Sequence, residues 1–188
     1  MSSDTRIRIY GRLSYANLWE PKSAYGNKPK YSVSIIIPKS DKATVNKVLK
    51  AIEKAKQIGI TKMFGGKLPD KFYQPLRDGD IERPNDPSYK NSYFINASSY
   101  NPPQIVDRGK NLILDRSEVY SGCYANVTVN IYPFNNGGNR GVSAGLGNVQ
   151  KVEDGEPLGG FFRAEDDFDV LDDDDDFCLL YTSDAADE

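Results

Sequence analysis

The chain has 188 residues, of which 38% are hydrophobic and 27% are charged, a composition typical of one soluble domain with a modest core. Its most apolar run, residues 33–37, is too short for a membrane-spanning helix, and residues 1–4 lack the apolar core of a secretory signal. Histidine is absent and only two cysteines occur, Cys123 and Cys178. This argues against a zinc cluster or a disulfide framework, and we expect a reducing, cytoplasmic setting.

Two strands are predicted near the N-terminus. In residues 5–16 apolar side chains alternate with arginines and a tyrosine, which indicates a half-buried strand with a basic, aromatic outer face. Residues 30–37 form the second strand, with its odd-numbered residues facing inward, and Pro38 ends it. The connecting residues 19–29 are rich in Gly, Pro and Lys and predict a flexible hairpin loop.

A helix is predicted from Ser40 or Asp41 to about Ile58, with Gly59 as its stop. Its expected apolar stripe consists of Val45, Val48, Leu49, Ile52 and Ala55. Lysines cover the rest of the helix, and a solvated face is their simplest interpretation.

The remaining elements favour a barrel. Residues 65–91 are a long irregular stretch, residues 93–98 a strand, residues 105–106 a short edge piece and residues 111–114 a further candidate strand. Residues 121–134 and 140–152 alternate well around a turn at residues 135–139. This order predicts a mainly β fold, an OB-fold-like small β-barrel with one amphipathic helix. The expected division is a binding domain (residues 1–162), an acidic tail (163–177) and a probable non-native appended sequence (178–188).

Charge is distributed unevenly along the chain. Residues 1–162 contain 23 Lys and Arg against 15 Asp and Glu, a net charge of +8, whereas residues 163–188 contain one basic and 12 acidic residues, a net charge of −11. Of the 21 aromatic residues, 18 lie in the basic part. The asymmetry suggests nucleic-acid binding combined with an interaction tail. The alternative is that the tyrosines only fill a β-rich core.

The sequence carries no catalytic motif. The aspartates of residues 172–176 lie in a solvated tail instead of on a rigid frame, and Gly65-Gly66-Lys67 lacks the rest of a phosphate-binding loop. We therefore expect no enzyme, no cofactor and no metal. A Mg²⁺-dependent nuclease that uses the carboxylates is kept as an alternative.

Binding of single-stranded DNA is the better-supported function. A single strand exposes phosphates and unpaired bases, so it requires cations along a groove and rings for stacking, which tolerates any base sequence. Candidate cations are Arg6, Arg8, Arg12, Lys28, Lys30, Lys67, Lys71, Arg77, Arg83 and Arg140. Candidate stacking rings are Tyr10, Trp19, Tyr25, Phe72, Tyr73, Tyr124 and Tyr132. Residues 77–80 (Arg-Asp-Gly-Asp) could instead form an internally paired turn.

The acidic segment cannot bury enough apolar area to offset its chain entropy, so we expect it to be disordered. Tethered to a basic groove, it would compete with DNA at an effective concentration on the order of millimolar. When DNA displaces it, Asp172, Asp173, Asp174, Asp175 and Asp176 would become available to partner proteins. The alternatives are a purely solubilising tail, or an adaptor protein that works through its tail alone.

Five long segments resemble the bacteriophage single-stranded DNA-binding proteins of the DUF2815 type. They are PLRDGDIERPNDPSY (75–89), YFINASS (93–99), VYSGCYANVTVNIYPFN (119–135), GNRGVSAGLGNVQKVEDGEPLGG (138–160) and AEDDF (164–168). The resemblance covers nearly all of residues 5–177. It implies an OB-fold that coats single-stranded DNA during phage replication and recombination in an infected bacterial host cell. It also implies an acidic tail that ends in an aromatic residue, here Phe177, and contacts phage or host replication proteins.

Two further expectations concern residues 178–188 and residues 139–147. Residues 178–188 depart from the family pattern and look like translated adaptor sequence. The Gly-rich residues 139–147 could pair with a second chain, which would give a homodimer.

Overall fold

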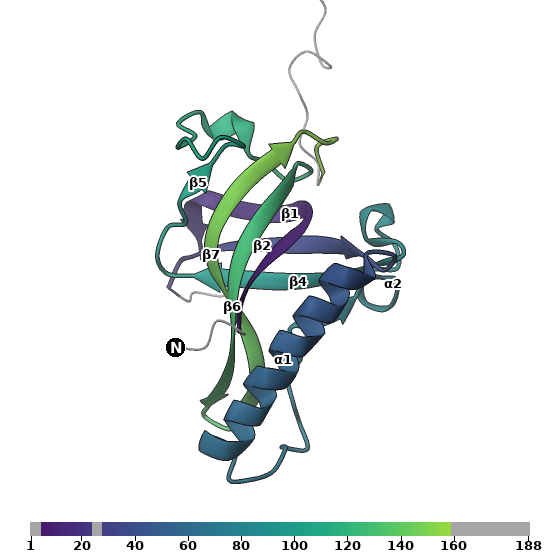
Figure 1. Cartoon of the computed structure of the whole chain (residues 1–188), viewed down its shortest axis with the longest axis vertical. Helices are drawn as coiled ribbons and strands as arrows, with labels where there is room; N and C mark the ends of the chain where they lie inside the picture. Colours follow the sequence, from purple (N-terminus) through teal and green to yellow (C-terminus); the bar gives the residue numbers. More distant parts are fainter. Residues whose placement is uncertain (1–4, 24–27, 159–188) are drawn as a thin grey trace, which may run out of the picture.

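Five long strands form a closed barrel in the computed structural model, which describes residues 5–23 and 28–158 (Figure 1). They are β1 (Arg6–Lys22), β2 (Lys30–Pro38), β4 (Ser92–Ser99), β6 (Tyr124–Asn136) and β7 (Asn139–Glu153). Strand β1 pairs with β2 and β6, β2 with β4, and β6 with β7. A parallel contact between Ser98 of β4 and Gly145 of β7 closes the ring. This is the connectivity of an OB-fold barrel, so the predicted fold class is confirmed.

Shorter elements extend this barrel. Strand β3 (Leu76–Asp78) pairs with β4, and β5 (Ile105–Val106) pairs with β7. The expected irregular stretch at residues 65–91 is thus partly ordered, because it also contains α2 (Gly79–Glu82) and the 3₁₀ turn η1 (Pro87–Tyr89). A second 3₁₀ turn, η2 (Arg116–Glu118), precedes β6. The candidate strand at residues 111–114 is reduced to one bridge, between Val106 and Leu112.

The barrel interior is filled by alternating residues of the five strands. On β1, Ile9 and Leu13 are fully buried, and on β6, Val127 and Val129 are fully buried as well. Their outward-facing neighbours are more exposed, as the alternation in the sequence predicts. No helix in residues 5–23 and 28–158 is long and apolar enough to cross a membrane.

Helix α1 (Lys42–Lys62) runs beside the lower part of β6 and β7 (Figure 1). Asp41 caps it, as predicted, by accepting hydrogen bonds from the backbone N–H and the hydroxyl of Thr44. Two details of the prediction are wrong. Leu49 is 47% exposed, and Gly59 lies inside the helix, where a Cβ atom would collide with Phe64 and Pro133. Glycine is therefore required at position 59 for close packing and not for the end of the helix.

A second, smaller cluster lies outside the barrel. Ile36 and Phe94 are paired residues of β2 and β4, and both are buried beneath Tyr89, with Leu158 packed against them. The rings of Tyr89 and Phe94 meet edge to face at 5.0 Å between centroids. Part of the outer face of β2 is thus covered as well as its inner face. Leu158 is the last described residue, so the described chain ends on this face.

In residues 139–147, strand β7 has backbone partners along both of its edges. This part of β7 pairs with β6 on one side. On its other side Gly141 pairs with Tyr73 and Gly145 with Ser98. Part of this edge is thus already occupied within the chain, and a homodimer through these residues stays a prediction.

Candidate nucleic-acid interface

The outer face of β2 and β4 is the first candidate surface, because OB-folds bind oligonucleotides on their second and third barrel strands. Paired residues of antiparallel strands share a face. Ser32 is paired with Ser98 and Ser34 with Asn96 on the same outer face as Ile36. Ser34 is buried and accepts a hydrogen bond from the hydroxyl of Tyr89, so Ser32, Asn96 and Ser98 are the short polar side chains that line the open part of this face. We call it the β2–β4 face.

Tyr100 borders one end of this face. Its side chain is 53% exposed, and it directly follows β4. The Nζ atoms of Lys28 and Lys30 lie 4.8 Å and 5.0 Å from the centroid of its ring. This spacing is typical of a cation–π contact, and it leaves part of the ring open to solvent.

Tyr15 borders the face on the β1 side. The pairing of β1 with β2 shifts between Ser14 and Asn17, and Tyr15 has a φ of +47° at this irregularity. The ring is 55% exposed, and the guanidinium carbon of Arg83 lies 5.0 Å from its centroid. The break in β1 therefore turns a bulky side chain outward, next to a cation that comes from the far side of β4.

A small cavity of about 240 Å³ lies beside Tyr15. Its lining residues are Ser14, Tyr15, Ala16, Asn17, Lys22, Asp86, Ser88, Ser121 and Leu158. Because Leu158 is among them, the described chain ends next to an exposed ring of the β2–β4 face.

A third ring and cation pair, Tyr73 with Arg77, lies at the β3 edge. Arg77 is paired with Phe94 of β4 and therefore shares its outer face. The guanidinium carbon lies 4.8 Å from the ring centroid of Tyr73, which is 38% exposed. A hydrogen bond with Tyr73 is the main cause that raises the pKa of Arg77, and an ion pair with Glu82 at 2.7 Å adds to it.

Of the internally paired turn considered for residues 77–80, the structure shows only the hydrogen bond between Asp78 and Asp80. Asp78 caps α2 by accepting a hydrogen bond from the backbone N–H of Asp80. Both carboxylates also form ion pairs at 2.9 Å with Lys39. These acids are therefore neutralised by Lys39, and Arg77 is directed to Tyr73 and Glu82 instead.

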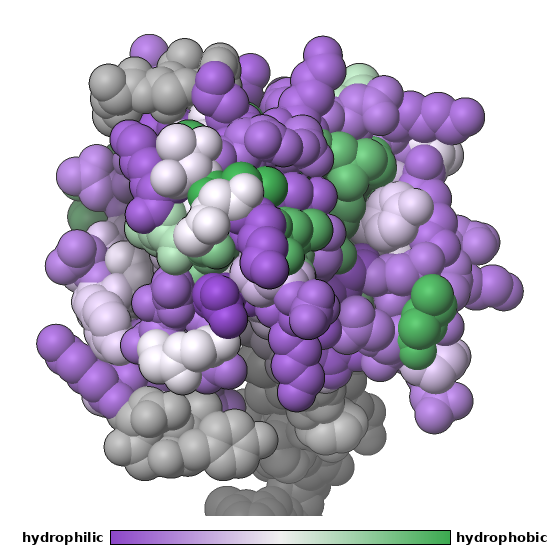
Figure 2. Space-filling view, turned by 90° about the horizontal axis from the view of Figure 1, so that it is seen from below, coloured by the Kyte–Doolittle hydropathy of each residue, from purple (hydrophilic) through white to green (hydrophobic). Residues whose placement is uncertain are grey.

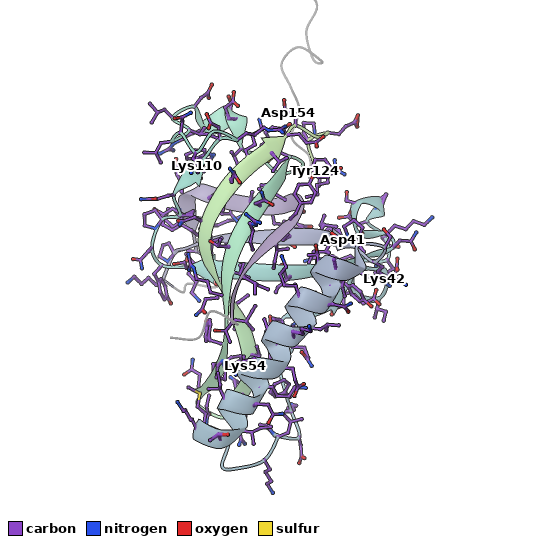
Figure 3. All side chains as sticks on the ribbon, in the orientation of Figure 1. Asp41, Lys42, Lys54, Lys110, Tyr124 and Asp154 are labelled. Carbon is purple, nitrogen blue, oxygen red and sulfur yellow. The ribbon has the colours of Figure 1, made fainter. Side chains whose placement is uncertain are left out.

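Several other predicted residues form a separate surface, the β1–β6 face. Arg6, Arg8, Tyr10 and Arg12 of β1 lie opposite Asn130, Thr128, Asn126 and Tyr124 of β6. Tyr10 and Tyr124 are stacked at 6.3 Å, and Tyr124 lies near the upper end of β6 (Figure 3). The guanidinium of Arg12 donates to the carbonyl oxygens of Gly122 and Glu156, at 3.0 Å and 2.7 Å. Arg12 is thus held by the backbone, whereas Arg6 and Arg8 are exposed.

Two predicted stacking residues pack against the main core. The indole of Trp19 is half-buried and its Nε1 donates to the carbonyl of Val119 at 3.1 Å. Phe72 is half-buried against the core and meets Phe64 edge to face. Burial leaves less of both rings for bases, so we do not include them in the interface.

The other predicted residues are dispersed. Tyr132 extends outward from β6 over Gly145, the carbonyl of Arg140 accepts the N–H of Tyr73, and Lys67 and Lys71 are exposed between α1 and β3. Tyr25, the aspartates 172–176 and Phe177 lie outside the described residues. Seen from below, hydrophilic residues cover most of the surface and hydrophobic ones form small groups (Figure 2).

Sequence reasoning missed Tyr15 and Tyr100. Tyr100 continues the alternation of Asn96 and Ser98 along the outer side of β4 by one step, and this signal could have identified it. Tyr15 had no such signal, because the irregularity in β1 interrupts the alternation there.

The chain belongs to the family described as the single-stranded DNA-binding protein of Enterobacter phage Enc34, whose model matches residues 7–178. Protein p50 of Acyrthosiphon pisum secondary endosymbiont phage 1 is 32% identical over an alignment of 172 residues, which covers 85% of this chain and 90% of p50. The family consists of binding proteins and not of enzymes, which agrees with the prediction from the sequence.

Solved structures show the same architecture. The phage Enc34 single-stranded DNA-binding protein in complex with ssDNA is 25% identical, with a TM-score of 0.72, and the match covers 82% of this chain and 90% of that one. The single-stranded DNA-binding protein gp2.5 of bacteriophage T7 shares the fold at 16% identity, with a TM-score of 0.61 over 86% of this chain and 99% of that one.

Proposed function

We propose that this protein binds single-stranded DNA without sequence preference and that the β2–β4 face is its main binding surface. One observation carries this choice of surface. Tyr15, Tyr73 and Tyr100 are partly open to solvent around this face, and each has a cation within 5.0 Å of its ring centroid. The family to which the chain belongs supports the choice of ligand.

The aromatic and the cationic side chains of this face would contact different parts of the DNA. Exposed rings stack on bases, and each stacked base contributes roughly 1–3 kcal/mol whatever its identity. Lys28, Lys30 and Arg83 would neutralise phosphates, which makes the affinity fall as salt rises. The short hydroxyls of Ser32 and Ser98 between the rings leave room for a strand to lie against the sheet.

We also propose that the acidic tail, residues 163–177, competes with DNA for this face and contacts partner proteins when DNA displaces it. The tail contains nine acidic residues and one basic residue, a net charge of −8. Leu158 packs beside Ile36 and Phe94 and lines the cavity next to Tyr15, so the chain leaves the described part at the binding face itself. A short tether from this point would give the tail a millimolar effective concentration, by order of magnitude. In this role the protein would coat single-stranded phage DNA during replication and recombination inside the host cell.

Fluorescence anisotropy of labelled oligo-dT, measured at several salt concentrations, tests the binding surface. We expect Tyr15→Ala and Tyr100→Ala each to weaken binding by roughly 5- to 150-fold, the equivalent of one lost stack. Leu114→Ala is the control, because Leu114 is 89% exposed and belongs to none of the three ring and cation pairs. Wild-type affinity in both tyrosine variants would refute the assignment of this face, and absence of wild-type binding at low salt would refute the function.

Truncation after Phe162 tests the tail. The competitor role predicts tighter DNA binding by the truncated protein, with the difference shrinking as salt screens the tail. Replacement of aspartates 172–176 by asparagine keeps the length of the tail and should reproduce most of the effect. Unchanged binding in both variants would favour the alternative, an adaptor whose tail serves partner proteins only.

A further inference from the structure

Helix α1 and the start of β1 together present a second basic surface. The backbone carbonyl of Arg8 accepts a hydrogen bond of 2.9 Å from Nζ of Lys47, which ties α1 to this part of β1. Lys50 follows one turn after Lys47 on the exposed side of the helix. Lys54, which is labelled in Figure 3, follows one turn later. We call Arg6, Arg8, Lys47 and Lys50 the basic ridge.

In the part of the chain that the structure describes, no acidic side chain pairs with the cations of this ridge. Within residues 5–23 and 28–158, none of the four forms an ion pair. The single acidic residue of α1, Glu53, is engaged by Gln57 at 2.8 Å and Lys56 at 3.4 Å, and these contacts lower its pKa. A group of exposed cations without acidic partners produces a positive potential that attracts polyanions.

The ridge differs in chemistry from the β2–β4 face. It contains no aromatic ring, and the nearest tyrosine along β1, Tyr10, is stacked on Tyr124. Long flexible cations suit phosphate oxygens, which carry no sequence information, and without rings they offer no aromatic stacking surface for bases. The exposed Asn130, paired with Arg6, adds an amide of the kind that also contacts phosphates.

We propose that the basic ridge is a second contact for nucleic acid, one that holds the sugar-phosphate backbone of DNA after it leaves the β2–β4 face. The inference rests on the proposed function of that face. Arg8 and Tyr15 are seven residues apart on β1, at most about 23 Å along an extended strand. A strand that passes Tyr15 and continues for several nucleotides can therefore reach the ridge, whereas a short oligonucleotide that fills only the β2–β4 face cannot.

The test compares oligo-dT of about 6 and about 16 nucleotides, which span the site sizes of OB-folds. The double variant Arg8→Gln/Lys50→Gln should bind the short oligonucleotide like the wild type. It should bind the long one about tenfold more weakly at low salt, with a log–log salt slope shallower by about 1.4, or 0.7 for each lost phosphate contact. The control Lys110→Gln/Arg116→Gln removes the same charge from exposed positions outside the ridge and should leave both affinities unchanged. Arg116, unlike the ridge cations, is ion-paired with Glu20 at 2.7 Å.

Each outcome has a distinct meaning. Equal affinities of the ridge variant and the control for the long oligonucleotide would overturn the proposal. An effect of the ridge variant that disappears after truncation at Phe162 would also overturn it, because the ridge would then be a site for the acidic tail. Failure of Tyr100→Ala to weaken short-oligonucleotide binding would instead count against the proposed function of the β2–β4 face.

Discussion

The guanidinium carbon of Arg83 lies 5.0 Å from the ring centroid of Tyr15, although 68 positions separate the two residues. Arg83 reaches this position because its backbone N–H donates to the carbonyl of Gly79 and ends α2 there. The same guanidinium carbon lies 5.4 Å from the ring of Tyr89 and 5.5 Å from that of Phe94. Arg83 thus links the small apolar cluster outside the barrel to the most exposed ring of the binding face.

Substitution of Arg83 should affect both stability and binding. Arg83→Ala removes the contact with the rings and should lower the free energy of unfolding by about 1 kcal/mol, as expected for a partly exposed cation–π contact. It should also weaken oligo-dT binding and make the salt slope shallower. Arg83→Lys keeps the charge but loses the planar stacking group, so its affinity should lie between those of the wild type and Arg83→Ala. Equal affinities of Arg83→Ala and wild type would show that Arg83 only supports the fold.

Two glycines of β7 offer a matched comparison. A Cβ atom at Gly141 would lie 2.5 Å from the carbonyl oxygen of Tyr73, whereas the nearest atom to a Cβ at Gly145 would be 3.6 Å away. Gly141→Ala should therefore push Tyr73 away and destabilise the protein by about 1–3 kcal/mol. Gly145→Ala should lower the free energy of unfolding far less than Gly141→Ala. Chemical denaturation of both variants measures the difference, and equal stabilities would contradict the close approach of Tyr73 to β7.

Asp80 should make stability depend on pH in the acid range. Its carboxylate accepts hydrogen bonds from Nζ of Lys39 and from the backbone N–H of Asn91, each at 2.9 Å, and these contacts lower its pKa. A carboxylate whose pKa is lower in the folded state stabilises the protein above its unfolded pKa, and this contribution is lost as the pH falls through the folded pKa. The difference in Tm between wild type and Asp80→Asn should therefore shrink as the pH is lowered below about 4.

The exposed Asp70 supplies the control for this measurement. Asp70→Asn should leave the pH profile of Tm close to that of the wild type, because the carboxylate forms no ion pair within the described part of the chain. A Tm difference between wild type and Asp80→Asn that stays constant from pH 6 to pH 3 would show that the carboxylate of Asp80 gains nothing from Lys39.

The thiol of Cys123 should react only slowly with thiol reagents in the folded protein. Its side chain is fully buried in the main core, and burial is the main cause that raises the pKa of its thiol. In a Cys178→Ser background, a thiol reagent at pH 8 should modify Cys123 only slowly, and rapidly once denaturant unfolds the chain. Fast stoichiometric modification under native conditions would mean that β6 opens locally near Cys123.

Individual strands and the helix could be predicted because local patterns specify them. The alternation in residues 121–134 predicts β6, with Val127 and Val129 inside, and the structure confirms it. Asp41 was identifiable as a cap from its type and its place before the helix. Leu49 was misplaced: it lies on one flank of the buried stripe and is 47% exposed, whereas Ala51, on the other flank, is buried.

The composition of the binding surface could not be predicted in the same way. The sequence shows that cations and rings occur in the same segments, but not which of them meet. The partners of Tyr15 and Tyr100, Arg83 and Lys28, are far away in sequence and come together only when β1, β2 and β4 are aligned. In the sequence, Trp19 and Phe72 look as suitable for base stacking as the exposed tyrosines do. Only the packing shows that they are half-buried against the core.

By itself, the sequence determined the β-barrel class, the sign of the charge on body and tail, and the type of chemistry available, because period, composition and residue type are local properties. Tertiary structure alone decided that Arg6 and Arg8 lie opposite β6 while Tyr100 lies beside Lys28, and that Leu158 and Tyr15 line the same cavity. The physical reason is closure of the barrel. The contact of β4 with β7 fixes which outer faces adjoin, and no local pattern in either strand encodes that contact.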